Sequence, residues 1–492
     1  MLAENKAAEL QRKQMVPRML VGRGERYGAP PRCKSAASAR TPTNQGDNEL
    51  EDTAERRTVP LVEMQRALDD IAVLAEAPAE AASRLDKYAL GHVVGTGTFG
   101  LVRVATHRAT RQLVAIKSYE RSRAKDSAQW KRLQGEARVM ERLDHPCIIR
   151  LFEAIEEPAA LHLVMEHVAG DVANLCEHVK RQRRLREKDA GALFGQVLAA
   201  VVYMHGLHVV HRDIKLENIL LDTRGGVKLV DFGFSALQTA RPFQTFCGTP
   251  CYMAPEIIHR KTYWGPPVDV WSLGVLLYAM LCGFFPFRAR NYSDLYRKIV
   301  KGAFDIPASL SADAHDLLRS MLAADPVMRL TVFDVRAHPW TRRFAASRPR
   351  QPLPLYRQLS LGTLPPATID ELRRLMLVAM GAFGVAPATV TASLQEKRHD
   401  GISTLYFLLL KRAEATCRGR RGVRDDPLPR AVVVDDCNAL AAASVRLGSP
   451  GNGLASSFAS LPRDDLELLE PEEDGVSNGD MRDVLRILER GR

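Results

Sequence analysis

Six polar side chains stand close together in the segment VVHRDIKLENILLD, Val209–Asp222, between apolar runs typical of strands. Burying such a group of charges is unfavourable unless each one is paired. A segment of this kind is therefore either an exposed loop or a place where chemistry is done, because functional side chains concentrate on loops held by rigid elements. It supplies carboxylates, cations and a carboxamide, and the question is what they act on.

A glycine-rich loop earlier in the chain indicates phosphate binding. Gly95, Gly97 and Gly100 follow one predicted strand, and Val102 opens the next strand. A dinucleotide-binding fingerprint needs a helix after the glycines, so this pattern excludes it. Glycines between two strands instead let the backbone approach a phosphate chain and donate N–H groups to it. A plain glycine-rich hairpin is the alternative for this loop taken alone.

A lysine and a glutamate are expected to meet beneath that loop. Lys117 lies in the next predicted strand, within VAIK, and Glu136 lies on the following predicted helix, one turn before Met140. An isolated Lys–Glu pair is usually an exposed pair that contributes little energy. Between a strand and a packed helix, the pair would instead fix the ammonium where it meets α- and β-phosphate oxygens.

The elements that position these residues change character along the chain. From Tyr88 to Val168, β-type segments surround one predicted helix, WKRLQGEARVMERL. After Gly170 the apolar spacing becomes mostly helical as far as Trp340. We therefore predict an α+β fold with a small β-rich lobe, a larger helical lobe and a cleft between them.

The segment before the β-rich lobe, residues 1–87, is a basic arm. Leu61 to Leu74 has the apolar spacing of a helix, which leaves two interpretations. A disordered arm with one transient helix is preferred over a folded domain, because the rest of the arm lacks the apolar content for a core.

Three regions follow the helical lobe. Residues 345–364 form a Pro-rich, basic linker, and residues 365–414 are predicted to form a small module of three short helices. The breaks between those helices are placed at Met380–Gly381 and Asp400–Gly401. The tail, residues 415–492, is turn-rich and then acidic, and we expect it to be mostly disordered.

Composition limits the classes of partner and compartment. A net charge of +11 favours acidic partners only weakly, and no basic face with interleaved aromatic residues supports nucleic-acid binding. The eight cysteines form no CxxC pair, so neither a zinc site nor a disulfide framework is expected. The longest apolar run, Leu273 to Phe285, is too short to span a bilayer, and the N-terminal sequence lacks the apolar core of a signal peptide. We expect a cytoplasmic protein with access to the nucleus and no transmembrane segment.

From Tyr88 to about Phe344 the chain resembles the eukaryotic protein kinases. The resemblance rests on motifs that occur in order, each in the context it requires. They are GTGTFGLV, VAIK, Glu136, HRDIKLEN, DFG at Asp231–Gly233, APE at Ala254–Glu256, DVWSLG at Asp269–Gly274, and Arg329. The resemblance implies a bilobal protein kinase domain at 88–344. It also implies the activity of a non-specific serine/threonine protein kinase, which transfers the γ-phosphate of Mg-ATP to protein hydroxyls.

The same resemblance assigns the catalytic roles. Asp213 would accept or orient the proton of the incoming hydroxyl, and Lys215 would stabilise the transferring phosphoryl group. Asn218 and Asp231 would hold magnesium. A lysine at position 215 resembles the Ser/Thr kinases rather than the tyrosine kinases.

The nucleotide site is assigned in the same way, with ATP and Mg²⁺ as the implied cofactors. Its expected residues are Gly95, Thr96, Gly97, Gly100, Lys117 and Glu136 at the phosphates, Val102, Ala115 and Leu220 around adenine, Met165 as gatekeeper, and the hinge backbone of Glu166 and Val168. Glu256 and Arg329 resemble a structural ion pair, and Asp269 would brace the catalytic loop.

One position departs from the family pattern. Val172 falls where many kinases carry an acidic residue that contacts ribose or a basic substrate residue, and Asp171 sits one place early. Unless a one-residue shift restores the contact, ribose binding and selection for a basic residue three before the acceptor are both in doubt.

Control of activity is also implied by the resemblance. Arg212 precedes Asp213, and in kinases of this kind that arginine pairs with a phosphorylated residue of the activation loop. Thr245 is the candidate phosphosite, with an upstream kinase as partner, and an unmodified loop threonine is the alternative. Thr249 resembles the loop threonine that contacts Asp213 and Lys215.

FCGTPCYMAPE, GPPVDVWSLGVLLYAMLCGFFPF and HPW look like the calcium/calmodulin-related group of kinases, and most like its AMP-activated and microtubule-affinity-regulating branch. The module at 365–414 resembles the ubiquitin-associated-like domain of that branch, although any compact helical bundle would show similar spacing. Two other classes compete. A pseudokinase scaffold is disfavoured by the presence of Lys117, Asp213, Asn218 and Asp231, and a small-molecule kinase by the activation segment through APE.

Overall fold

The computed structural model describes residues 61–73, 84–96, 100–124, 126–168, 174–222, 225–344, 355–360 and 364–420. The chain divides into two compact units, residues 1–56 and 57–492. All described residues belong to the second unit, and the account below is of that unit alone.

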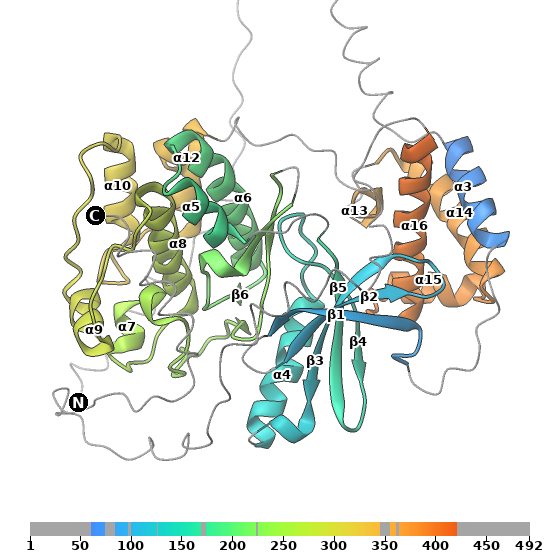
Figure 1. Cartoon of the computed structure of the whole chain (residues 1–492), viewed down its shortest axis with the longest axis horizontal. Helices are drawn as coiled ribbons and strands as arrows, with labels where there is room; N and C mark the ends of the chain where they lie inside the picture. Colours follow the sequence, from blue (N-terminus) through green and yellow to red (C-terminus); the bar gives the residue numbers. More distant parts are fainter. Residues whose placement is uncertain are drawn as a thin grey trace, which may run out of the picture. The chain divides into compact units, whose positions relative to one another are not determined.

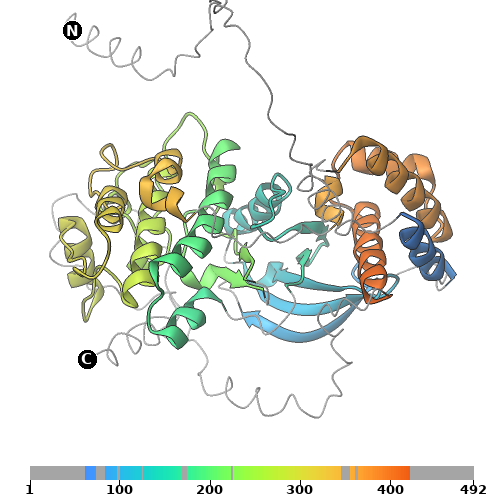
Figure 2. The same cartoon turned by 90° about the horizontal axis from the view of Figure 1, so that it is seen from above.

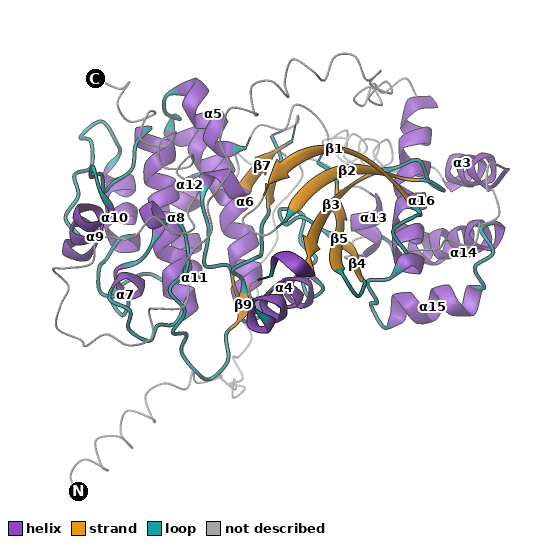
Figure 3. Ribbon diagram, turned by 60° about the horizontal axis from the view of Figure 1, so that its bottom comes forward, coloured by secondary structure: helices purple, strands orange, loops and turns teal. Residues whose placement is uncertain are grey.

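A five-stranded antiparallel sheet forms the first part of residues 88–344, the predicted kinase domain (hereafter the catalytic region), with strand order β1-β2-β3-β5-β4. The strands are β1 (Tyr88–Thr96), β2 (Leu101–His107), β3 (Leu113–Glu120), β4 (Leu151–Glu156) and β5 (Ala160–Glu166). Figure 3 shows them as one curved layer. Alternating apolar residues on β3, such as Val114 and Ile116, are buried on one face of it.

One helix, α4 (Ser127–Met140), lies beside this sheet (Figure 3). The carboxylate of Asp126 accepts from the backbone N–H of Gln129 at 2.6 Å, which caps the first turn. Trp130, Leu133 and Met140 are buried at helical spacing. The helix preceding the sheet's last two strands therefore begins three residues earlier than the predicted segment and presents Glu136 inward.

The second part of the catalytic region is helical. Its helices are α5 (Leu175–Gln182), α6 (Glu187–Gly206), α7 (Pro255–Ile258), α8 (Gly265–Cys282), α9 (Tyr292–Lys301), α10 (Ala312–Met321), α11 (Val332–Ala337) and α12 (Pro339–Arg343), with short 3₁₀ turns at Arg121–Arg123, Leu216–Asn218 and Pro250–Tyr252. Together with the sheet they confirm the predicted α+β fold with a β-rich and a helical lobe.

Helix α8 forms the centre of the helical lobe. It is apolar on all sides and almost every residue on it is buried, as expected of a core helix. Among the described residues it is the one helix long and apolar enough to cross a membrane, but 89% of that window is buried inside the protein. Gly283 ends it in the left-handed conformation (φ 79°), where a Cβ would lie 1.9 Å from the carbonyl oxygen of Arg183.

Two short antiparallel ladders hold the polar segment Val209–Asp222. They pair β6 (Val209–Val210) with β9 (Ala236–Leu237), and β7 (Ile219–Leu221) with β8 (Val227–Leu229). The apolar residues Val209, Val210 and Ile219 are fully buried. The polar residues between them are thus held in a loop that is anchored at both ends.

A helical module follows the catalytic region. It comprises α14 (Pro366–Ala382), α15 (Pro387–Gln395) and α16 (Gly401–Arg420). The predicted break at Met380–Gly381 is slightly early: α14 ends at Ala382 and the chain turns at Gly384, which has a φ of 75°. The predicted break at Asp400–Gly401 coincides with the start of α16.

Two further helices pack with this module, in segments that were predicted to be an arm and a linker. Helix α13 (Leu355–Ser360) lies within the predicted linker, and α3 (Leu61–Val73) lies within the predicted disordered arm. Met64, Leu68 and Ile71 of α3 are at most 3% exposed and share a core with α14 and α16. Figures 1 and 2 both show α3 against those two helices. The expectation of a transient helix is therefore wrong for residues 61–73, because distant helices bury its apolar face.

The module also contributes to the core of the sheet. Leu408 of α16 is fully buried in one cluster with Tyr88, Val164 and other residues of the strands. Both ring nitrogens of His399 lie 3.0 Å from backbone carbonyl oxygens of the catalytic region, those of Leu151 and Glu141. Apolar packing and hydrogen bonds thus join the two parts.

Candidate active site

The predicted lysine and glutamate meet, and a third residue joins them. The Lys117 ammonium lies 2.9 Å from Glu136 Oε1 and 2.8 Å from Asp231 Oδ1. Register explains the placement, because Lys117 on β3 is opposite Val102 on β2 and Leu163 on β5. The hydroxyl of Tyr119 donates to the other oxygen of Glu136. Strand, helix and DFG segment are therefore joined through one ammonium.

Charge in this triad is strongly stabilised. Burial alone would lower the pKa of Lys117, but Glu136 and Asp231 raise it well above its ordinary value. Burial would raise the pKa of Asp231, yet the Lys117 ammonium holds it below its ordinary value. At neutral pH both groups are charged, as a site for phosphate and metal requires.

Asp213 lies at the centre of a second group of contacts. Its Oδ1 accepts from the hydroxyl of Thr249 at 2.8 Å and from the Thr249 backbone N–H at 3.0 Å. Lys215 Nζ lies 3.2 Å from Asp213 Oδ2 and donates to the Thr249 hydroxyl at 3.0 Å. The side-chain amide of Asn218 donates to the Asp213 backbone carbonyl at 3.0 Å. Asp213, Lys215 and Asn218, to which the resemblance assigns catalytic roles, thus form one connected cluster.

Asn218 and Asp231 are brought near one another by backbone pairing. The N–H of Val230, the residue before Asp231, donates to the carbonyl oxygen of Asn218 at 2.9 Å. The β7–β8 ladder that begins at Ile219 and Leu229 keeps the two segments side by side. The Asn218 side-chain amide and the Asp231 carboxylate are thereby carried by backbone segments that lie side by side.

Two residues of the site have a left-handed backbone. Arg212 has a φ of 64° and Asp231 a φ of 63°, conformations that non-glycine residues rarely adopt. Asp269 holds the first of them, since its carboxylate accepts from the N–H of Arg212 at 2.8 Å and of His211 at 2.9 Å. Asp269 is fully buried and also contacts His205 Nε2 at 2.8 Å. The strained loop is therefore fixed by a buried carboxylate.

The walls expected around a nucleotide lie on three strands. Val102 on β2, Ala115 on β3 and Leu220 on β7 are half-buried, as is Val168 after β5. Met165 is opposite Ala115 in the ladder and is 8% exposed. Gly95 and Thr96 end β1. Gly97, Asp171 and Val172 lie outside the described residues. The departure from the family pattern at Val172, which concerns ribose binding, therefore stays a prediction.

Gly100 is the glycine of that loop whose lack of a side chain has a clear steric reason. A Cβ at this position would lie 2.6 Å from the carbonyl oxygen of Ser118 and 2.8 Å from the ring of Tyr119. The backbone of the loop therefore approaches β3 more closely than any other residue would allow.

The activation segment places Thr245 at the surface and Arg212 nearby. Thr245 is exposed. The Tyr263 hydroxyl donates to the Thr245 carbonyl at 2.8 Å and accepts from Arg212 at 3.4 Å, so one side chain links both residues. The Arg212 guanidinium also donates to the Phe234 carbonyl at 2.8 Å and stacks 4.5 Å from the Phe243 ring centroid.

Glu256 and Arg329 form the predicted ion pair of the helical lobe. The guanidinium donates to both carboxylate oxygens, at 2.8 and 3.1 Å, and further donates to the carbonyl of Pro267 at 2.7 Å. Both side chains are buried. The bidentate geometry and additional acceptors are what a buried pair needs to be favourable.

The sequence analysis assigned a role only to the backbone of Glu166 and did not predict the partners of its side chain. Its carboxylate is buried and accepts from Lys228 at 2.9 Å, from the Tyr356 hydroxyl at 2.7 Å and from Arg357 at 3.1 Å. Burial would raise the pKa of Glu166, but Lys228 and Arg357 hold it well below its usual range. The only sequence signal was the apolar spacing of Leu355 and Leu359 in a segment interpreted as a linker.

The donor set fits magnesium and a triphosphate. Asn218 and Asp231 offer the oxygen ligands that Mg²⁺ prefers, and the Asp231 side chain is 41% exposed toward solvent. The Lys117 ammonium, fixed by two carboxylates, offers a cation to phosphate oxygens. These side chains converge from β3, the 3₁₀ turn before β7 and the segment after β8.

Comparison with known proteins agrees with this geometry. The family described as the protein kinase domain matches residues 88–341. The chain belongs to the protein kinase family. Protein kinases use ATP with magnesium, and the domain implies protein substrates.

Several relatives of this kinase carry informative names. It is 35% identical to serine/threonine-protein kinase SIK2 of Gallus gallus over 67% of its own length and 40% of the relative's. It is 38% identical to serine/threonine protein kinase OSK3 of Oryza sativa over 66% and 62% of the two lengths. It is 37% identical to SNF1-related protein kinase catalytic subunit alpha KIN12 of Arabidopsis thaliana over 70% and 67%.

These relatives confirm the predicted resemblance to the AMP-activated protein kinase branch of the calcium/calmodulin-related group. The matched part of the kinase spans 40 to 67% of the length of those relatives.

Proposed function

We propose that this chain is an active serine/threonine protein kinase that transfers the γ-phosphate of Mg-ATP to serine or threonine hydroxyls of proteins. The observation that carries the proposal is the cluster around Asp213. A carboxylate held by Thr249 and approached by the Lys215 ammonium at 3.2 Å can orient an incoming hydroxyl and accept its proton.

The other residues position charge. Lys117, fixed by Glu136 and Asp231, would hold the α- and β-phosphates, and Lys215 would stabilise negative charge on the transferred group. Asn218 and Asp231 would hold magnesium, which when bound neutralises the β- and γ-phosphate oxygens. Gly95, Thr96, Gly97 and Gly100 would cover the phosphates with backbone N–H groups.

Adenine would lie between Val102, Ala115 and Leu220, with the backbone of Glu166 and Val168 as its hydrogen-bonding edge and Met165 behind it. The half-buried state of the first three side chains supports this assignment. Burial of the Glu166 carboxylate also supports it, because that side chain turns away from the cleft to Lys228, Tyr356 and Arg357.

Regulation by phosphorylation of Thr245 is part of the same proposal. The residue is exposed to an upstream kinase, and Arg212 already contacts Tyr263, the side chain that holds the Thr245 backbone. A phosphate at Thr245 could draw the Arg212 guanidinium from the Phe243 ring to a charge-assisted hydrogen bond. The resemblance of α14–α16 to a ubiquitin-associated-like domain, and a cytoplasmic location with nuclear access, stay proposals.

A phosphate-transfer assay tests the proposal. The full chain, first phosphorylated on Thr245, is incubated with magnesium, radiolabelled ATP and a generic basic peptide, and labelled serine or threonine is identified. Asp213→Asn is the matched control, because it keeps the size of the side chain and removes its basicity. We expect it to lower turnover on the order of 10²- to 10⁴-fold. Transfer no faster than in the control would leave the pseudokinase scaffold as the correct class.

A further inference from the structure

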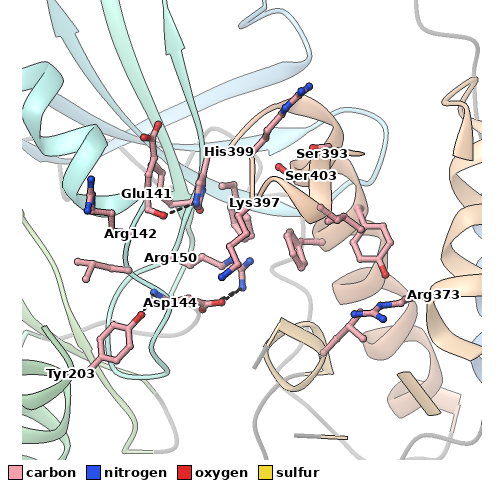
Figure 4. Close-up of a pocket in the computed structure, with 18 residues that line it drawn as sticks. Glu141, Arg142, Asp144, Arg150, Tyr203, Arg373, Ser393, Lys397, His399 and Ser403 are labelled. Atoms are coloured by element: carbon pink, nitrogen blue, oxygen red, sulfur yellow. Dashed lines mark hydrogen bonds and ion pairs between the residues drawn. The ribbon is translucent and has the colours of Figure 1, made fainter. Parts of the chain in front are cut away.

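A cavity of about 480 Å³ lies where the helical module meets the catalytic region, away from all residues assigned to the nucleotide. Figure 4 shows its labelled lining residues arriving from both sides. One wall is the segment after α4 and the start of β4, and the other comprises α14, α15, the turn after α15 and α16. A volume of this size is within the range of small-molecule sites.

The lining carries an excess of positive charge. Its basic residues are Arg142, Arg150, Arg373, Lys397 and Arg398, and its acidic residues are Glu141 and Asp144. Asp144 is already shared, since it pairs with Arg150 at 3.3 Å and with Arg357 of helix α13. Arg373 pairs with Asp370 at 3.7 Å and Arg398 pairs with Glu396 at 2.6 Å, both outside the lining, so the uncompensated charge lies on the remaining cations.

Two of these cations have no acidic partner within ion-pairing distance among the residues that the structure describes. They are Arg142, from the catalytic wall, and Lys397, from the module wall, and both are exposed to the cavity's solvent. Lys397 has a φ of 51°. This left-handed backbone closes the C-terminus of α15, where the N–H of Arg398 donates to the carbonyl of Ser393 at 2.9 Å and that of Lys397 to the carbonyl of Leu394 at 3.2 Å.

Arg150 adds a buried positive charge to the same wall. Its side chain is 7% exposed and stacks 4.1 Å from the ring centroid of Phe407. Burial, reinforced by the nearby Arg357, lowers the pKa of Arg150 despite Asp144. The Arg150 guanidinium shares the Asp144 carboxylate with Arg357, so a further anion in the cavity would add a charge-assisted contact.

A buried hydroxyl beside the cavity also lacks a partner. The Tyr406 ring lines the cavity and the residue is 1% exposed, yet its hydroxyl has no hydrogen-bond partner among the described residues. Buried polar groups are nearly always paired, so such an atom calls for an explanation. The hydroxyl oxygen is itself inaccessible to solvent and lies in the core of the module, so it is not part of the proposed ligand site.

Apart from Ser393, His399 and Ser403, the rest of the lining is apolar or aromatic, including Leu151, Phe152, Leu394 and Phe407. Cations at two opposing walls suit a dianionic group, and the apolar surface suits an uncharged organic body attached to it. We propose that this cavity binds a small phosphate monoester, with its phosphate between Arg142 and Lys397 and its organic body against the aromatic side chains.

Binding at this place would tie the module to the catalytic region. The two walls belong to different parts, and His399 already joins them by hydrogen bonds to Glu141 and Leu151. Glu141 directly follows α4, the helix that carries Glu136. A ligand that bridges the walls stabilises their contact by its own binding free energy.

Calorimetric titration of the full chain tests the proposal, with a non-hydrolysable ATP analogue present at saturation so that the nucleotide site is occupied. The probes are phenyl phosphate, inorganic phosphate and phenol. We expect phenyl phosphate to bind, inorganic phosphate to bind more weakly, and phenol to give no heat. The double variant Arg142→Ala/Lys397→Ala should bind phenyl phosphate at least about tenfold more weakly, since two charge-assisted contacts are lost.

Neighbouring arginines on α14 provide a matched control. Arg373 lines the cavity, whereas Arg374 is outside its lining and pairs with Glu371 at 2.6 Å. Arg373→Ala should weaken binding and Arg374→Ala should leave it unchanged. All four substituted positions are exposed, and an unchanged melting temperature will show that each variant folds.

The outcomes separate this site from the proposed activity. The inactive variant Asp213→Asn should bind phenyl phosphate as the wild-type chain does, because the readout needs no catalysis. Equal binding by the double variant, or no binding by the wild-type chain while the ATP analogue occupies the nucleotide site, would each overturn the cavity proposal. Equal affinity for inorganic phosphate would overturn the assignment of an organic body.

Discussion

The guanidinium of Arg357 lies 3.1 Å from the carboxylate of Glu166, so a residue that follows the catalytic domain contacts the last residue of strand β5. Both side chains are buried, at 1% and 9% exposure. Arg357 also donates to the carbonyl of Ile148 at 3.1 Å and pairs with Asp144. The expected hinge of the nucleotide site is therefore supported from behind by helix α13.

Replacing Arg357 by leucine should destabilise the protein. The substitution leaves Glu166 with one cation, Lys228, and leaves buried acceptors unsatisfied, and breaking a buried pair typically removes about 3–5 kcal/mol. Urea unfolding followed by tryptophan fluorescence measures the loss. Arg373→Leu is the control, because that side chain is 60% exposed and should change the free energy of unfolding by less than about 0.5 kcal/mol. Equal stability of both variants would contradict a supporting role for Arg357.

Glu166 should also give the protein an acid-dependent stability. Burial opposes ionisation, but Lys228 and Arg357 lower the pKa of the folded state well below the unfolded value of about 4.3. The folded state therefore gains stability above the unfolded pKa, and this gain is lost as pH falls through the folded pKa. Burial lowers the pKa of Lys228 even though it is paired with Glu166, so Lys228 does not add to the loss of stability at acid pH. That loss is therefore assigned to the Glu166 carboxylate.

Glu166→Gln provides the comparison for that prediction. The difference in free energy of unfolding between wild type and variant should be constant from pH 6 to pH 8 and should shrink below about pH 4. Unfolding by urea at several pH values gives both curves. A difference that stayed constant down to pH 3 would mean that another group causes the loss of stability at acid pH.

Thr245→Ala should lower activity and leave stability nearly unchanged. The side chain is exposed and only its backbone carbonyl is used, by the Tyr263 hydroxyl at 2.8 Å. Loss of one or two charge-assisted bonds from phosphate to Arg212 corresponds to a loss on the order of tenfold to hundredfold in turnover. Peptide phosphorylation after treatment with an upstream kinase, with thermal unfolding alongside, measures both effects. Full activity of the variant would remove Thr245 from the account of regulation.

Local patterns predicted the parts of the site that depend on short-range geometry. Lys117 and Glu136 meet because strand alternation and helix phase each fix one of them, and both periodicities are visible in the sequence. Except for Thr249, all members of the Asp213 cluster lie within a stretch of six residues, 213–218. The α+β division likewise follows from a change of apolar period near Gly170.

Contacts between distant segments could not be predicted in this way. Glu166 and Arg357 are separated by 191 positions, and neither apolar period nor composition indicates that they meet. At Met380–Gly381 the break between helices was placed slightly early, because the residue that adopts the left-handed turn is Gly384 rather than Gly381. For residues 61–73 the sequence predicts only a transient helix, and no local pattern indicates the helices beyond the catalytic domain that bury its apolar face.

Helix α3 is expected to stabilise the module. Leu68 is 2% exposed against α14 and α16, so Leu68→Ala should remove about 2–5 kcal/mol of local stability. Hydrogen exchange should show faster exchange in α14 and α16, with α8 unchanged. Val62→Ala is the control, since Val62 lies on the same helix and is 65% exposed. Equal protection in the two variants would show that α3 is not needed by the module.

Pairing of α3 with α14 and α16 has a consequence for synthesis of the chain. The helix leaves the ribosome before the catalytic domain, and its partners follow roughly 300 residues later. At about 5–20 residues per second, the apolar stripe of Met64, Ala67, Leu68 and Ile71 waits some 15 to 60 s for its partner helices. During that interval the nascent stripe is a binding site for chaperones and a starting point for aggregation, which the finished protein no longer presents.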